Sequence, residues 1–195
     1  MKNLKTFKIV AVFALSIIIS FSFSIVQSNI EIGDLAPSFQ ANNQNGELWN
    51  SSDYYGKGFV VVYFYPAALT GGCTKQACSY RDFESRLNDL DVEVVGVSGD
   101  AVKNLKIFEK EHQLNFTLLS DISGDIAVKF GVPTVAGGTI EKEISSGKIS
   151  LSRSITTKRW TFIIDKNSKI VYKDMAVNAA EDSKKVIDFI KKSTD

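Results

Sequence analysis

The sequence predicts an α/β fold in which helices flank a central β-sheet. Two runs of β-branched and aromatic residues, GFVVVYFY at 58–65 and VEVVGV at 92–97, have the continuous apolar character of strands that are buried on both faces. A segment with helical spacing of apolar residues follows each run. Strands that alternate with helices in this way form a sheet with a parallel centre.

The first half of the chain adds a hairpin and a helix to this framework. Residues 29–37 form an extended lead-in that Gly and Pro punctuate. Asn45-Gly46 within 38–53 is a strong hairpin signal, because this dipeptide suits tight turns between antiparallel strands. Residues 73–90 carry apolar side chains at spacings of three and four, which predicts a helix after the first buried strand.

The second half contributes further elements of both kinds and ends in a helix. In order, they are a helix at 101–113, a short strand at 117–119, a short helix at 122–130, two strands at 160–165 and 170–173 joined by a KNS turn, and a helix at 180–192. The two late strands form a hairpin, so the predicted sheet is mixed. Before them, residues 134–157 are polar and rich in Gly and Ser, and we interpret them as an extra surface hairpin.

The N-terminus has the pattern of a secretory signal peptide. Lysines at positions 2, 5 and 8 precede an apolar stretch at 9–26 that contains no charge, and Gln27-Ser28 follow as a polar exit. We predict cleavage after residue 28, which leaves one domain at 29–195 in the periplasm or another extracytoplasmic or organellar compartment. The alternative is that 9–26 stay as a membrane anchor, because the stretch is near the lower length of a membrane span.

Composition and charge indicate a globular domain without a nucleic-acid surface. Hydrophobic residues make up 44% and charged residues 23% of the 195-residue chain, which is enough for one core of ordinary size. The formal net charge of +1 becomes −2 when the three lysines of 1–28 are removed. A nearly neutral domain has no basic field for nucleic acid.

The chain has two cysteines, Cys73 and Cys78, which could form a structural bridge, a metal clip or a reactive couple. Cys73 is predicted just past the carboxyl end of the first buried strand, at a helix start, where open α/β sheets place reactive sites. Unpaired N–H groups and the positive end of the helix dipole favour a thiolate there. Gly71 and Gly72 allow a tight turn. Thr70 is placed to offer its hydroxyl to the sulfur or to a substrate oxygen, and it could also cap the helix, since the two roles are compatible.

The spacing of the two cysteines disfavours a bridge in an intact helix. Five residues advance about 7.5 Å and rotate about 140° along a helix, whereas a disulfide needs Cα atoms within about 7 Å. We therefore interpret the pair as reactive, closing only when the helix unwinds. A zinc site would need further ligands. The single histidine, His112, lies in a predicted helix among Phe and Leu residues, where a packing or solvated role is expected.

The segment YFYPAALTGGCTKQACSYRDF resembles the active-site segment of the peroxiredoxins, in the alkyl hydroperoxide reductase and thiol-specific antioxidant family. The family pattern of Pro, three residues, Thr, two residues and Cys falls on Pro66, Thr70 and Cys73. A second cysteine five residues later is similar to the Q-type branch, also called bacterioferritin comigratory protein. GDLAPSFQ, VEVVGVSGD and FTLLSD are similar to family segments in the same order, and KRWTFIID aligns Arg159 with the family's catalytic arginine. The resemblance covers about residues 31–195.

The resemblance implies a thioredoxin-like fold, with a central mixed β-sheet flanked by helices, and a peroxidase that reduces hydrogen peroxide and organic hydroperoxides. It implies that Cys73 is the peroxidatic nucleophile and becomes a sulfenic acid. Thr70 and Arg159 would polarise the peroxide, and Pro66 would shield the site from water. Cys78 is implied as the resolving cysteine, and a thioredoxin-like dithiol would reduce the resulting Cys73–Cys78 disulfide. No metal, haem or flavin cofactor is implied, and a monomer can complete this cycle.

Three features depart from the family pattern. Gly71 stands where the family usually has Pro, Trp160 follows Arg159 where a small polar residue is commoner, and 134–157 are longer than this branch leads us to expect. The alternative function is an exported thiol-disulfide oxidoreductase of the same fold, although the Cys-x-x-Cys motif of such proteins is missing. A non-catalytic chaperone or binding module on this fold is a third interpretation.

Overall fold

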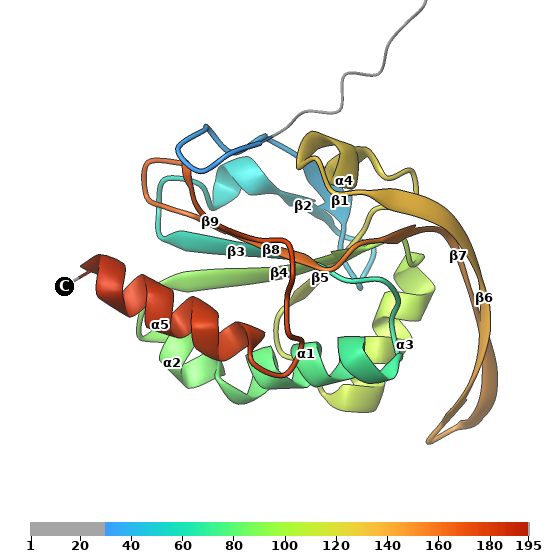
Figure 1. Cartoon of the computed structure of the whole chain (residues 1–195). Coiled ribbons are helices and arrows are strands. Elements are labelled where there is room, and N and C mark those ends of the chain that lie inside the picture. Colours follow the sequence, from blue (N-terminus) through green and yellow to red (C-terminus); the bar gives the residue numbers. More distant parts are fainter. Residues whose placement is uncertain (1–29, 195) are drawn as a thin grey trace, which may run out of the picture.

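The computed structural model describes residues 30–194, and the predicted signal segment at 1–28 lies outside them. The centre of the fold is a five-stranded sheet in the order β5-β4-β3-β8-β9 (Figure 1). Its strands are β3 Phe59–Phe64, β4 Val92–Ser98, β5 Thr117–Ser120, β8 Trp160–Ile164 and β9 Ile170–Asp174. Strands β3, β4 and β5 run parallel, while β8 pairs antiparallel with both β3 and β9. The predicted mixed sheet with a parallel centre is confirmed.

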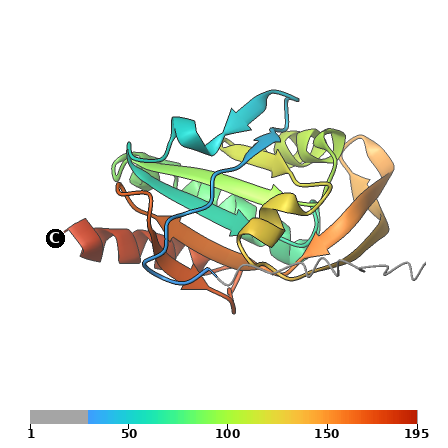
Figure 2. The same cartoon turned by 90° about the horizontal axis from the view of Figure 1, so that it is seen from above.

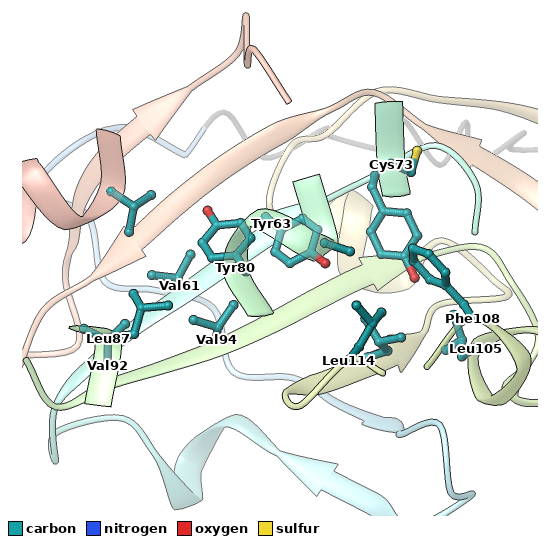
Figure 3. Close-up of a cluster of buried hydrophobic side chains, with 14 of the residues drawn as sticks. Val61, Tyr63, Cys73, Tyr80, Leu87, Val92, Val94, Leu105, Phe108 and Leu114 are labelled. Carbon is teal, nitrogen blue, oxygen red and sulfur yellow. The ribbon is translucent and has the colours of Figure 1, made fainter. Parts of the chain in front are cut away.

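Strand β3 lies in the middle of the sheet and is buried along its whole length. The odd-numbered Val61 and Tyr63 belong to one hydrophobic cluster, and the even-numbered residues from Val60 on belong to another. Figure 3 shows the first cluster, in which Tyr63 stacks on Tyr80 with ring centroids 4.9 Å apart. The continuous apolar run is needed because both faces of this strand are covered.

Helices cover the face of the sheet that carries the first cluster. They are α1 Gly71–Asp82, α2 Glu84–Asn88, α3 Val102–His112 and α5 Asp182–Thr194 (Figure 1). The other face is covered by the hairpin β1 Gln40–Asn42 with β2 Leu48–Asn50, a 3-10 turn Ser51–Asp53 and α4 Asp125–Lys129 (Figure 2). The predicted hairpin around Asn45-Gly46 is therefore confirmed, and it closes the second cluster.

The helix predicted at 73–90 is in fact two helices. Helix α1 already starts at Gly71. Phe83, with φ −102° and ψ 12°, lies outside the helical conformation and separates α1 from α2. The apolar spacing is the same on both sides of this break, so it indicated one continuous helix.

The helix predicted at 122–130 is confined to the five residues of α4. Asp121 lies outside it, and its carboxylate accepts hydrogen bonds from the N–H groups of Ile126 and Ala127. These bonds satisfy backbone donors of the first turn, which fixes where the helix begins.

The polar segment between α4 and β8 forms a long antiparallel hairpin, as predicted, with β6 Thr134–Ile144 and β7 Gly147–Thr157. It arches past the edge of the sheet and runs down beside α3 (Figure 1). Leu151 is fully buried. Three isoleucines also pack against the first cluster: Ile140, Ile144 and Ile149. Glu111 on α3 accepts hydrogen bonds from the N–H and the hydroxyl of Ser145 at the turn, so the hairpin is fastened to α3.

Candidate active site

The loop between β3 and α1 brings Cys73 to the carboxyl ends of the two central parallel strands. Tyr65 continues the pairing of β3 by donating its N–H to a carbonyl of β4 at 3.1 Å. Ala68 then donates its N–H to the Asp100 carboxylate at 2.8 Å, and Leu69 turns the chain with a left-handed φ of 61°. Helix α1 starts two residues later, in the crevice where α/β sheets hold their sites.

Arg159 contacts the sulfur of Cys73 directly. Its Nη2 donates a hydrogen bond to Cys73 Sγ at 3.2 Å, and its Nη1 donates to Gln76 Oε1 at 2.5 Å. Arg159 immediately precedes β8, and Trp160 of that strand pairs with Phe64 at the end of β3. The register of the sheet therefore sets the arginine beside the start of α1, although 86 positions separate it from the cysteine.

Thr70 occupies the N-cap position of α1, but its side chain does not cap the helix. The hydroxyl donates instead to the carbonyl of Ala67 at 2.8 Å. The capping interpretation is therefore wrong for the side chain. Because a hydroxyl has one proton, Thr70 in this arrangement can accept a hydrogen bond from a neighbouring group but cannot also donate one to the sulfur.

The helix start supplies backbone donors and space around the cysteine. The first intrahelical bond runs from the Thr74 N–H to the Thr70 carbonyl at 2.8 Å, so the N–H groups of residues 71–73 have no partner within α1. Gly72 leaves room for the arginine, since a Cβ at this position would lie 3.3 Å from Arg159 Nη2. The thiol itself is buried, with 2% of Cys73 exposed.

Two residues that the sequence patterns did not single out, Gln76 and Asp182, extend this site. Gln76 is fully buried and donates through Nε2 to Asp182 Oδ2 at 2.6 Å. The same oxygen accepts from the hydroxyls of Tyr80 at 2.7 Å and Thr161 at 2.9 Å. Burial raises the pKa of Asp182, and these three hydrogen bonds act in the opposite direction. The helical spacing of three between Cys73 and Gln76 could have indicated their proximity.

Cys78 is half-buried on the same helix, and both cysteines are free thiols. Helix α1 is unbroken across the two positions, so the separation expected from their spacing applies. Arg81 lies beside Cys78: hydrogen bonding to Asp82 raises the pKa of Arg81, and the Cys78 thiol adds to that shift. Cys78 cannot reach Cys73 while α1 stays intact.

A pocket of about 240 Å³ opens beside Arg159. Its apolar lining comes from Pro66, Pro133 and Val135, and the chain at 156–158 completes it. Pro66 is half-buried, whereas Val135, at the base of the long hairpin, is 64% exposed. Two further hollows lie at the N-terminal end of β4, away from the cysteine.

His112 packs edge-on against Phe108 with ring centroids 5.5 Å apart, which confirms the expected packing role. Burial lowers its pKa. Within residues 30–194, no group of three or more His, Cys, Asp or Glu side chains could hold a metal ion. None of the helices in this part of the chain is long and apolar enough to cross a membrane.

The chain has relatives of similar sequence and of similar structure among known proteins. The chain matches the AhpC/TSA family over residues 32–173. It is 37% identical to peroxiredoxin Q, chloroplastic, of Oryza sativa subsp. japonica over 148 residues, which are 76% of this chain and 60% of the rice protein. It is 45% identical to peroxiredoxin Bcp of Escherichia coli K12 over 103 residues, which are 53% of this chain and 65% of that protein. Each match therefore spans less than two thirds of the relative's own length.

The fold has solved counterparts. The crystal structure of peroxidoxin BcpB from Mycobacterium tuberculosis superposes with a TM-score of 0.69 at 29% identity, covering 84% of this chain and 97% of that one. The expected thioredoxin-like fold, with a central mixed sheet flanked by helices, is confirmed.

Proposed function

Because the chain belongs to the AhpC/TSA family, we propose that it is a thiol-dependent peroxidase whose nucleophile is Cys73. The hydrogen bond from Arg159 to the Cys73 sulfur carries this proposal. A guanidinium beside the sulfur and the unpaired N–H groups of a helix start both stabilise a thiolate, which is the reactive form of a cysteine.

In the first proposed step, the Cys73 thiolate attacks the terminal oxygen of a hydroperoxide, R–O–O–H. The S–O bond forms as the O–O bond breaks, so the sulfur is oxidised to a sulfenic acid and RO⁻ leaves. The leaving oxygen takes a proton from solvent water and departs as an alcohol, or as water when R is hydrogen. Arg159 and the backbone donors at residues 71–73 are placed to stabilise its charge, and Thr70 can accept a hydrogen bond from the peroxide O–H.

In the second proposed step, Cys78 acts as the resolving cysteine. Its sulfur attacks the sulfenic sulfur of Cys73, the S–S bond forms, and the hydroxyl leaves as water with the proton of the Cys78 thiol. Because both residues lie on one intact helix, α1 must unwind before the sulfurs can meet.

A thioredoxin-like dithiol is the proposed reductant. Two thiol–disulfide exchanges return both cysteines to thiols and leave the disulfide on the partner. The sulfur atoms of the cysteines and of the dithiol transfer the two electrons that reduce the peroxide, so the proposal includes no metal or organic cofactor. It includes no nucleic acid either, and it lets a monomer complete the cycle because both cysteines belong to one chain.

The proposed substrates are hydrogen peroxide and organic hydroperoxides. The pocket beside Arg159 supports the organic class, because its walls are apolar and Arg159 contacts the Cys73 sulfur. The apolar walls come from Pro66, Pro133 and Val135. An alkyl group is stabilised by leaving water for such a surface. Pro66 also limits the access of water to this side of the site.

Residues 1–28 are proposed to direct export, with residues 29–195 as the mature domain. The basic start and uncharged apolar stretch support export, and retention of 9–26 as an anchor is the alternative outcome. The mass of the protein recovered from cells tests this proposal. A chain that begins at Asn29 agrees with it, and a full-length chain in the membrane fraction contradicts it.

Replacement of Cys73 by Ser tests the proposed function. We expect the variant to lose consumption of hydrogen peroxide in the presence of a dithiol reductant. Cys78→Ser is the matched control, because it removes the other thiol and should retain one turnover. Unchanged peroxide consumption by Cys73→Ser would show that Cys73 is not the nucleophile.

A further inference from the structure

Asp182 is a buried carboxylate in contact with the helix that carries both cysteines. It is the first residue of α5 and is fully buried. All three of its side-chain hydrogen bonds converge on Oδ2, while Oδ1 has no hydrogen-bond partner. A carboxyl group with an unpartnered oxygen is costly to bury, so packing alone does not explain its presence here.

The carboxylate fixes the orientation of the Gln76 amide. Its Oδ2 accepts all three hydrogen bonds, so Gln76 turns its NH₂ group toward Asp182. Its carbonyl oxygen then faces the other way and accepts the hydrogen bond from Arg159 Nη1. With Nη1 held there, Nη2 of the same guanidinium points at the sulfur of Cys73. A continuous path of hydrogen bonds thus runs from Asp182 on α5 through Gln76 and Arg159 to the sulfur of Cys73.

The same carboxylate holds α1 in its helical form. Gln76 lies between the two cysteines, and Tyr80 lies just beyond the second, so Asp182 binds α1 on both sides of Cys78. A hydrogen bond between the hydroxyls of Ser79 and Ser183 adds a further tie between the two helices. Unwinding of α1 must break these contacts before Cys78 can approach Cys73.

We infer that Asp182 is a positioning residue with opposite effects on the two steps of the cycle. It speeds the attack on peroxide by holding Arg159 against Cys73, and it slows disulfide formation by holding α1 wound. This inference rests on the proposed function for its kinetic part and on the contacts of α1 with α5 for its structural part.

Asp182→Asn is the variant that tests it. The new amide keeps an oxygen that can accept from Gln76, Tyr80 and Thr161, but it has lost the negative charge, so these hydrogen bonds weaken and the Gln76 amide is held less firmly against Arg159. We expect the reaction of Cys73 with hydrogen peroxide to slow by roughly tenfold to a hundredfold, as for the loss of a hydrogen bond to a charged group. Disulfide formation from the sulfenic acid should become faster, and less Cys73 should be over-oxidised to sulfinic acid at a given peroxide concentration. Asp188→Asn, an exposed position on the same helix, is the matched control and should change neither rate.

A double-mutant cycle separates positioning from general destabilisation. In a Gln76→Met background, Asp182→Asn should have little further effect on the peroxide step, because its action passes through Gln76. Equal slowing of both steps by Asp182→Asn, additive effects in the cycle, or unchanged rates would each overturn the inference.

Amide hydrogen exchange gives a readout that does not depend on activity. In the reduced protein, Asp182→Asn should speed exchange within α1 while Asp188→Asn leaves it unchanged. If Asp182→Asn does not fold, Thr161→Val removes one donor to the same carboxylate and should speed exchange in the same helix. If exchange is faster but the native protein has no peroxidase activity, the proposed function is overturned and the structural part of the inference, that Asp182 holds α1 wound, is retained. Unchanged exchange in Asp182→Asn and in Thr161→Val would overturn the inference alone.

Discussion

Arg153 on strand β7 forms a buried ion pair with Asp100, two residues beyond the end of strand β4, with Nε 3.6 Å from Oδ1. The two side chains are 7% and 0% exposed. Asp100 also accepts the N–H of Ala68 in the loop that leads to Cys73. The long hairpin is thereby fastened to the same carboxylate that shapes the active-site loop.

Breaking this ion pair is expected to destabilise the whole domain. Arg153→Met leaves Asp100 as an unpaired buried charge, which costs about 3–5 kcal/mol of unfolding free energy. Chemical denaturation measures this loss. Lys148→Met is the control on the same strand, because Lys148 is 68% exposed and its pair with Glu141, at 3.9 Å, contributes about 1 kcal/mol or less. Equal stabilities of the two variants would contradict the prediction.

The two glycines before Cys73 are expected to differ in their tolerance of a side chain. Gly72→Ala places a methyl group 3.3 Å from Arg159 Nη2, so the guanidinium that donates to the sulfur must move by a few tenths of an ångström. The reaction of Cys73 with peroxide should slow by up to about tenfold, less than for a full ångström of misplacement. Gly71→Ala meets nothing within 4 Å and serves as the control. The second-order rate constants of the two variants decide the matter, and identical values would show that the arginine has room to move.

Thr70 is expected to act through its oxygen rather than through its proton. Because its hydroxyl already donates to Ala67, the proposed role is to accept the peroxide O–H. Thr70→Val removes this acceptor and should slow the peroxide step on the order of tenfold. Thr70→Ser retains the oxygen and should keep most of the rate. Stopped-flow measurement of both variants distinguishes the hydroxyl from the methyl group, and equal slowing would point to packing instead.

Cys78→Ser is expected to separate the first turnover from recycling. The single-turnover rate with peroxide should match that of the native protein, since Cys78 lies away from Cys73 on α1. Steady-state turnover with a thioredoxin-like reductant should stop, and Cys73 should proceed to sulfinic acid because no thiol traps the sulfenic acid. Mass spectrometry of the oxidised protein detects this product. Sustained turnover at the native rate would remove Cys78 from the cycle.

Asp182 is expected to make stability depend on pH. Burial raises the pKa of its carboxyl in the folded protein above its ordinary value of 3.8. Between the ordinary and the raised pKa, the folded protein therefore keeps a proton that the unfolded chain releases. The stability that this proton contributes is complete below the ordinary pKa, and it is lost as the pH rises through the raised pKa. The difference in unfolding free energy between native protein and Asp182→Asn should fall as the pH rises above the ordinary value, and it should level off once the folded carboxyl has lost its proton.

The comparison between these two proteins isolates this one carboxyl. Burial also raises the pKa of Glu93 and Asp121, but both groups are present in each protein and their contributions cancel in the difference. Denaturant titrations at several pH values provide the measurement. A difference that stays constant or grows with pH would contradict the prediction.

Local patterns predicted the framework of the fold. The apolar run of β3 and the Asn45-Gly46 turn each depend on neighbouring residues, so the sequence alone could indicate them. The break at Phe83 could not be foreseen, because apolar side chains continue at helical spacing across it. The bounds of α4 depend on hydrogen bonds from Asp121, which spacing does not reveal.

The residues of the candidate site that could be predicted are those that belong to a recognisable sequence motif. Pro66, Thr70 and Cys73 lie within one loop and helix start, while Arg159 reaches the sulfur only through the pairing of β8 with β3. Asp182 lies 106 positions from Gln76, and its place in the site depends on how α5 packs on α1. Such contacts follow from the assembled fold and leave no trace in the spacing of residues.

Both cysteines belong to α1, and in the proposed cycle this gives the oxidised protein a different shape from the reduced one. The turn that unwinds to let the sulfurs meet also releases Gln76 and its neighbours from α5. In that cycle, the unwound backbone of this segment would be available to a reductant before any sulfur is exchanged. In this proposed cycle, the oxidised protein would contain less helix than the reduced protein.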